Sequence, residues 1–401
     1  MKISFVSFEY QPIKTPQSLR WQKLLSHLAE ARPVSVRVFN APASIDSPFH
    51  DINFLSSFEE EVFSAFPHRV KKRTVATVPT HPSKKSPNTF MKWIKSAVKE
   101  RLPFDKSFLW AFKSRTAFIN FLERDLPDVV ISSSPPFGAM ILAWFAKRHY
   151  KKNIKWVCDL GDPWSFASDR KLGPIMRTII GAMEKYFLSS ADHIIVTNNR
   201  TKSEYLKILD VEESRISVIY QGADTNRNEE PLSAELAGDY VYTGTFYKNI
   251  REPHALFEAF SLSSRNLTVA GNIDPIFFPE KKSDRIAFIG NLGERDVKKL
   301  QRSAAALIFI DNFNSTQLPG KLFEYVATGR PVICIGVADD SPVNEVEFLD
   351  YPIVFCSNDT EDISRALEKV DKIGLQDYFG ELNVSWKGRA NQLGRIIDEL
   401  Y

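Results

Sequence analysis

Short apolar runs alternate with amphipathic stretches along almost the whole chain. In the first half, the predicted strands at residues 3–8, 128–133 and 154–158, each with an apolar centre, are followed by segments with the helical spacing of apolar residues. The alternation returns after residue 239 and continues to the C-terminus. Regular alternation of strands and helices is typical of parallel sheets with helices on both faces. The pattern predicts an α/β protein with two doubly wound, Rossmann-like domains facing a central cleft.

The boundary between the two domains is predicted where the chain becomes polar and acidic, at residues 224–239. We therefore expect an N-terminal domain at residues 1–225 and a C-terminal domain at residues 226–384. The last segment, residues 385–401, has a helical pattern. We expect it to pack back on the N-terminal domain.

One predicted helix, near residues 319–328, begins with polar and small residues and ends at Gly329. Pro319 suits a first turn, and the amides around Gly320 and Lys321 together with the lysine ammonium form a candidate anion site. Glu324, one turn further, could hydrogen-bond a ribose diol. The alternative is a well-capped surface helix in which Glu324 forms only a salt bridge.

A second candidate anion site follows the predicted strand at residues 240–243. Gly244 allows backbone amides to approach a phosphate closely. Lys248 and Arg251 could supply a point charge and forked hydrogen bonds. The alternative is an ordinary loop between a strand and a helix, with solvated cations.

The net charge of +3 conceals an excess of basic residues in the first 225 residues and of acidic residues in the rest. Between Arg69 and Arg101 there are ten basic residues and a single acid, Glu100, with apolar residues interleaved in the later part. A basic amphipathic segment of this kind can lie on anionic lipid, and the alternative is a solvated charged surface. No nucleic-acid recognition motif accompanies the charge, which argues against DNA or RNA as a partner.

Other sequence features limit the class of protein. The three cysteines lie in or beside apolar runs, which favours reduced thiols in a cytosolic protein. No apolar run approaches the length of a membrane span, and the N-terminus does not resemble a secretion signal. No cysteine or histidine cluster has metal-binding spacing, and the glycine-rich nucleotide-binding motifs are absent. The sequence predicts a cytoplasmic protein, which the basic segment could place at the inner face of a membrane, with no metal and no cofactor.

Several segments together resemble bacterial glycosyltransferase family 4, of the cell-surface polysaccharide type, which has the two-domain GT-B architecture. They are Ser-Ser-Pro-Pro-Phe (133–137), Asp-Leu-Gly-Asp-Pro-Trp (159–164), Tyr-Thr-Gly-Thr-Phe-Tyr (242–247), Lys-Leu-Phe-Glu-Tyr-Val-Ala-Thr-Gly-Arg-Pro-Val (321–332) and Ser-Trp-Lys-Gly-Arg-Ala (385–390). The resemblance implies a metal-independent retaining glycosyltransferase. Such an enzyme moves a sugar from a nucleotide diphosphate, with UDP slightly preferred, to a lipid-linked or glycan acceptor.

The resemblance also implies roles for individual residues. It implies donor binding by Gly244, Thr245, Lys248, Arg251, Pro319, Gly320, Lys321 and Glu324. It places Ser134, Pro135, Phe137 and Trp164 on the acceptor side and implies catalytic roles for Asp162, Lys321 and Arg251.

Three positions depart from the family pattern. Thr316 stands where many relatives have a second acid, and Gly161 stands where many have a histidine or arginine. Residues 14–18 replace an early glycine-rich loop. Thr316 and Gly161 favour one alternative, a catalytically silent partner subunit. A second alternative, a nucleotide-sugar epimerase of the same fold, would need acid and base residues near the donor sugar, and the scarcity of histidine argues against it.

Overall fold

The computed structural model describes residues 1–11, 15–41, 106–167, 172–224, 239–248, 250–279, 283–312, 317–345, 351–373 and 384–401, and the backbone of 58–59. The described chain divides into two compact units. Unit 1 comprises Met1–Val196, Thr201–Val218 and Leu393–Tyr401, and unit 2 comprises Thr197–Arg200 and Ile219–Gln392. The basic segment between Arg69 and Arg101 lies outside the described residues, as does Thr316.

Unit 1 is built on a seven-stranded sheet with the order β3-β2-β1-β4-β5-β6-β7, and all its strand pairs are parallel. Its strands are β1 (Lys2–Ser7), β2 (Ser35–Asn40), β3 (Phe58–Glu59), β4 (Val129–Ser134), β5 (Lys155–Leu160), β6 (His193–Val196) and β7 (Ile216–Val218). Most positions of β1, β4 and β5 are buried, as expected for a parallel sheet covered on both faces.

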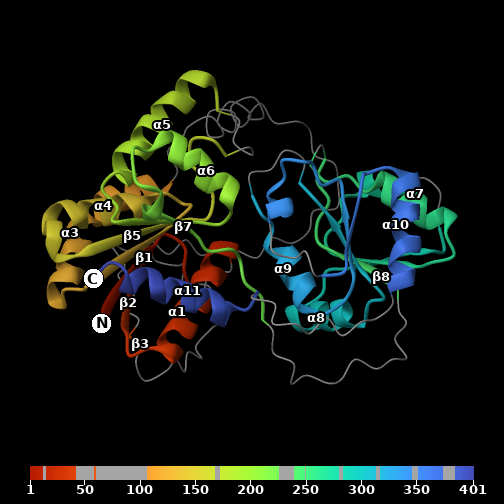
Figure 1. Ribbon diagram of the computed structural model, residues 1–401, viewed down its shortest axis with the longest axis horizontal. Coiled ribbons are helices and arrows are strands. Elements are labelled where there is room, and N and C mark those ends of the chain that lie inside the picture. The colour runs from red at the N-terminus through yellow and green to blue at the C-terminus, as the bar shows by residue number, and fades with distance from the viewer. Residues whose placement is uncertain are drawn as a thin grey trace, which may run out of the picture. The chain divides into compact units, whose positions relative to one another are not determined.

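Helices cover both faces of this sheet (Figure 1). They are α1 (Pro16–Ala31), α3 (Lys106–Arg124), α4 (Gly138–Tyr150), α5 (Pro174–Leu188), α6 (Asn199–Ile208) and α11 (Trp386–Asp398), with 3-10 turns η1 (Lys151–Asn153) and η2 (Glu213–Arg215). The core between the sheet and α3 to α6 is rich in aromatic residues, among them Trp110, Phe118, Trp156 and Tyr205.

Unit 2 has a six-stranded parallel sheet with the order β10-β9-β8-β11-β12-β13. Its strands are β8 (Tyr240–Thr243), β9 (Leu267–Ala270), β10 (Ile286–Gly290), β11 (Leu307–Ile310), β12 (Val332–Ile335) and β13 (Ile353–Cys356). Between and after them lie α7 (His254–Leu262), η3 (Pro275–Phe277), α8 (Glu294–Ser303), α9 (Gly320–Ala327), η4 (Pro342–Glu345) and α10 (Thr360–Ile373). Helices α7 and α10 lie side by side over one core (Figure 1).

Local sequence signals explain several element ends. Thr15 caps α1 by accepting the amide of Ser18, and Pro16 follows in the first turn. Gly329 has φ of +78° after α9, the left-handed conformation expected for a helix C-cap. Pro319 was expected in the first turn of α9 but is its N-cap, with an extended backbone. The amide of Gly320 therefore opens the helix.

The two Rossmann-like units confirm the predicted fold class. Helix α11 passes from unit 2 into unit 1, because Leu393–Tyr401 group with the N-terminal sheet. Arg32 holds this end by donating to the Gly394 carbonyl at 3.1 Å and to both Asp398 carboxylate oxygens at 2.6 Å. Among the described residues, no helix is both long enough and apolar enough to cross a membrane.

Candidate functional site

In unit 1, the predicted acceptor-side residues follow β4 and β5, at the carboxyl edge of the sheet. Ser134 is the last residue of β4 and is fully buried, while Pro135 after it is half-buried. Asp162 is half-buried in the turn after β5. The fold therefore brings the Ser-Pro-Pro-Phe and Asp-Pro-Trp segments to adjacent strands, which pair from Val129 to Ser134 with Lys155 to Leu160.

Trp164 and Phe137 are buried, with 0% and 1% of their surface exposed. Their rings stack with centroids 4.8 Å apart, and Phe108 lies 5.2 Å from the Trp164 ring. At this exposure neither ring can present a face to an acceptor. We infer that both side chains support the loop from beneath.

The backbone of the Asp-Pro-Trp loop is held by Glu184, a buried residue of α5 that the sequence analysis did not identify. Its carboxylate accepts the amides of Trp164 at 2.9 Å and Ser165 at 3.0 Å, the Ser165 hydroxyl at 2.6 Å, and the Tyr205 hydroxyl. Burial raises the pKa of Glu184, and the hydrogen bonds from Ser165 and Tyr205 oppose the rise. With every partner a donor, the carboxylate fixes the loop that carries Asp162.

A second buried carboxylate, Asp159, lies at the end of β5. It accepts hydrogen bonds from Trp21 Nε1 at 2.7 Å and Gln17 Nε2 at 2.5 Å, and pairs with Arg20. Burial raises its pKa, and the nearby Arg20 charge opposes that shift. Gln17 also lies against Gly161, because a Cβ at residue 161 would stand 2.5 Å from Gln17 Oε1. The first turn of α1 therefore fills the space where a side chain at residue 161 would go.

In unit 2, the turn after β8 brings Gly244 close to the backbone of the neighbouring strand. Gly244 donates to the Ala270 carbonyl at 2.9 Å, and its own carbonyl would be 1.9 Å from a Cβ at residue 271. Gly244 and Gly271 have φ of +149° and +145°. Both positions therefore need glycine. Gly271 was missed because a single glycine in a sequence gives no sign of the backbone that approaches it.

Arg251 lies in the loop before α7 and is anchored by Asn312. Its Nη2 donates to Asn312 Oδ1 at 2.6 Å, and its buried Nε has no hydrogen-bond partner among the described residues. Asn312 follows β11 beside Asp311, whose carboxylate accepts the Asn312 amide at 2.8 Å and the Ser341 hydroxyl at 2.6 Å. Lys248, in the same loop, is exposed.

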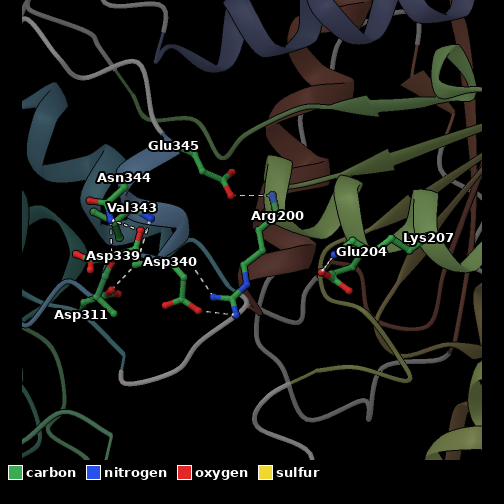
Figure 2. A network of polar contacts seen from close by, with 11 residues as sticks. Arg200, Glu204, Lys207, Asp311, Asp339, Asp340, Val343, Asn344 and Glu345 are labelled. Carbon is green, nitrogen blue, oxygen red and sulfur yellow. Dashed lines mark hydrogen bonds and ion pairs between the residues drawn. The ribbon is translucent and has the colours of Figure 1, made fainter.

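The turn that carries Ser341 also holds the short segment Thr197–Arg200 within unit 2. Glu345 accepts the amides of Asn199 at 2.6 Å and Arg200 at 2.7 Å, and Arg200 pairs with Asp340 at 3.1 Å (Figure 2). Asp311 lies in the same network (Figure 2). Through Asp311 and Asn312, this network reaches Arg251.

Helix α9 is tied to the end of β8 by Tyr325, whose hydroxyl accepts the Thr243 amide at 2.9 Å. Gln301 of α8 donates to the Thr243 hydroxyl at 2.9 Å. Because Thr243 immediately precedes Gly244, the Tyr325 bond joins α9 to the strand end that leads into the loop of Gly244. Neither contact could be predicted from the sequence, since both join residues far apart in the chain.

Lys321 and Glu324 form a salt bridge of 3.1 Å, with side chains 35% and 51% exposed. The alternative of a salt-bridged surface helix therefore describes part of the structure. Such exposed pairs contribute only about 0–1 kcal/mol. A bound anion with charged hydrogen bonds, at about 1.5–3 kcal/mol each, could therefore separate them.

Part of the chain is similar in sequence to a known protein family. Residues 61–227 match the sequence profile of Glycosyltransferase Family 4. This match confirms, over that part of the chain, the resemblance that the motifs indicated. Among curated protein sequences, none matches the chain.

Solved structures similar over the whole chain include the apo form of the lipopolysaccharide outer core galactosyltransferase WaaB, with 14% identity, full coverage of both chains and a TM-score of 0.62. A glycosyltransferase from Rickettsia africae has 12% identity and a TM-score of 0.62, covering 100% of this chain and 98% of that one. UDP-GlcNAc 2-epimerase from Neisseria meningitidis, bound to UDP-GlcNAc, has 11% identity, full coverage of both chains and a TM-score of 0.56. These similarities establish a GT-B fold.

Proposed function

We propose that the protein is a retaining glycosyltransferase that moves a sugar from a nucleotide diphosphate to a lipid-linked or glycan acceptor in surface polysaccharide synthesis. The observation that carries the proposal is the Glycosyltransferase Family 4 match at residues 61–227. The GT-B fold supports it but is shared with epimerases. UDP is the preferred nucleotide, because a structure of the same fold holds a UDP-sugar.

Unit 2 is proposed to bind the donor. Loop residues Gly244 to Arg251 and the start of α9 are linked through Thr243, so their amides and cations can act on one diphosphate. The buried Nε of Arg251, which has no hydrogen-bond partner among the described residues, is a donor that a phosphate oxygen would satisfy. As the sugar leaves, negative charge grows on the diphosphate, and Lys321 and Arg251 would stabilise that charge.

Unit 1 is proposed to bind the acceptor, with Asp162 beside the reacting groups. The half-buried Pro135 would border the acceptor, while the buried Ser134, Phe137 and Trp164 would hold the loop in place from the core. In this proposal, Asp162 acts after donor binding. Substitutions at Asp162 and in unit 2 should therefore have different effects.

Calorimetric titration with UDP tests the donor site. We expect Arg251→Ala, Lys321→Ala and Glu324→Ala each to weaken binding by about 1–3 kcal/mol, the value of a lost charged hydrogen bond. Glu368→Ala and Lys372→Ala, at exposed positions of α10, are matched controls and should bind UDP like the wild type. Unchanged affinity in all three site variants would refute the assignment.

Measuring turnover of the nucleotide-sugar donor distinguishes a transferase from a silent subunit and from an epimerase. We expect the protein to release UDP from one UDP-sugar of a panel, and Asp162→Asn to lower that release while keeping UDP affinity. Retention is checked by the anomeric configuration of the product in NMR spectra. UDP binding without turnover of any donor, with candidate acceptors present, would favour a silent subunit, and an epimerised UDP-sugar would favour an epimerase.

A further inference from the structure

An unusual surface lies on unit 1, where α3, α4 and α5 lie next to one another on one side of the sheet (Figure 1). Helix α5 exposes an apolar stripe at Ile175, Ile179, Ala182 and Tyr186. These positions are three or four residues apart, so they share one face of the helix. Ile175 is 78% exposed, which is far from the burial usual for isoleucine.

The apolar surface continues across the three helices through aromatic contacts. The Tyr186 ring of α5 lies 5.6 Å from Trp144 of α4, and Trp144 lies 5.0 Å from Phe145. Phe145 in turn lies 5.8 Å from Phe112 of α3, which is 59% exposed. Leu109, one turn before Phe112, is 64% exposed. One connected apolar surface therefore spans three helices.

Basic side chains are exposed on the same three helices. On the three helices, which the structure describes throughout, the exposed basic residues are Lys106, Lys113, Arg115, Arg124, Arg148, Arg177 and Lys185. Glu123 is the one exposed acidic residue of these helices, since Glu184 is buried. Arg115 lies 4.6 Å from the Phe145 ring centre and Arg148 lies 5.0 Å from that of Trp144. Cations are thus interleaved with the apolar groups.

We propose that this α3–α5 face docks on a lipid bilayer that contains anionic headgroups. Exposed aliphatic and aromatic side chains would enter the boundary between headgroups and acyl chains, and the surrounding lysines and arginines would attract the anionic leaflet. The near absence of acidic residues from the face favours an anionic surface over a protein partner of mixed charge. This inference goes beyond the proposed function and does not depend on it.

Co-sedimentation tests the proposal with vesicles of phosphatidylcholine alone or mixed with phosphatidylglycerol, at low and high salt. We expect the wild type to bind only the mixed vesicles, and more weakly at high salt. Each basic residue near such a surface contributes about 1 kcal/mol, so Arg177→Glu with Lys185→Glu should lower partitioning roughly thirtyfold or more. Ile175→Ser with Ile179→Ser should also lower it.

Matched controls lie on exposed positions of unit 2. Leu262→Ser and Lys299→Glu should bind vesicles like the wild type. All four changes of the face are at exposed positions, so their unfolding midpoints should match the wild type and confirm that each variant folds. UDP titration of each variant reports the donor site separately.

Three results would overturn the proposal. The first is that the face variants bind vesicles as well as the wild type does. This includes the case in which Lys92→Glu with Lys95→Glu, in the basic segment, abolishes the binding instead. Equal binding to uncharged and anionic vesicles is the second. The third is a concentration-dependent dimer that Ile175→Ser disrupts in the absence of any lipid binding, since a second copy would then cover the face.

Discussion

At the scale of single residues, the chemistry of the candidate site depends on which donors and acceptors of each side chain are already bonded to neighbouring residues. Arg251 could be chosen from the sequence because its position after a glycine turn suggested an anion site. Its bond to Asn312 depends on a distant strand end, and its Nε has no partner within the part of the chain that the structure describes. The motif therefore identified the residue, and the fold decides which of its donors remains for a ligand.

His193 gives a prediction about pH at this scale. The residue lies in β6, and burial, with smaller effects of Arg215 and Lys202, lowers the pKa of His193 to about 4. An unfolded histidine binds a proton near pH 6.5. Between these pH values the unfolded chain holds more protons than the folded chain. The contribution of the neutral His193 to the free energy of unfolding is therefore fully present above about pH 6.5 and is lost as the pH drops toward 4. At about 1.4 kcal/mol per pKa unit, the loss is of order 3 kcal/mol.

Urea unfolding near neutral pH and near pH 5 checks this prediction. We expect His193→Gln to lose less stability on acidification than the wild type. His149→Gln, at an exposed position of α4, is the control and should follow the wild type. Equal acid sensitivity of His193→Gln and the wild type would contradict the prediction.

At the scale of elements, the structure shows that a helix can hold a distant loop in place, although the sequence of the helix does not indicate this contact. The pattern of α5 predicts a helix, but it does not predict that Glu184 faces inward. Four donors around its carboxylate show that the helix anchors the Asp-Pro-Trp loop. Apolar residues at Ile175 and Ile179 face outward on the same helix, against the usual rule that apolar residues face the core.

Glu184→Ala should destabilise unit 1 and loosen the loop that carries Asp162. It would leave four buried donors without an acceptor, and each such group costs about 1–3 kcal/mol. We expect a large drop in the unfolding midpoint of unit 1, and Glu184→Gln should recover part of it because the amide oxygen still accepts. Lys185→Ala, the exposed neighbour, is the control.

Steady-state kinetics at a temperature where both Glu184 variants are folded separates positioning from stability. If the loop positions Asp162, Glu184→Gln should lower kcat while UDP affinity, measured on unit 2, stays unchanged. A wild-type kcat in a folded Glu184→Gln would show that the carboxylate supports only the fold.

At the scale of the whole molecule, the two units have separate hydrophobic cores, and this predicts separate unfolding transitions. Six of the seven tryptophans precede residue 197, so tryptophan fluorescence reports mainly unit 1. Circular dichroism reports both units. We expect the two signals to give different midpoints in urea.

Adding UDP should raise the urea midpoint of unit 2 only, because the proposed donor-binding residues all lie in that unit. At about a hundred times its dissociation constant, a ligand adds about 2.7 kcal/mol of stability. The circular dichroism transition assigned to unit 2 should rise, and the fluorescence midpoint should stay in place. A shift of the fluorescence transition alone would place the nucleotide on unit 1.

The sequence by itself determined that strands and helices alternate in two successive domains. It also located single elements, including β5 near residues 154–158, β8 at Tyr240–Thr243 and α9 near residues 319–328. It could do so because periodicity, caps and glycine stops act over a few residues. It also brought the Asp162 and Lys321 motifs to attention. Only the tertiary structure decided that Trp164 supports its loop from the core, that Glu184 anchors that loop, and that α3 to α5 share an apolar, basic face. Burial and hydrogen bonding between distant segments depend on which elements pack together. A pattern of a few neighbouring residues does not determine that packing.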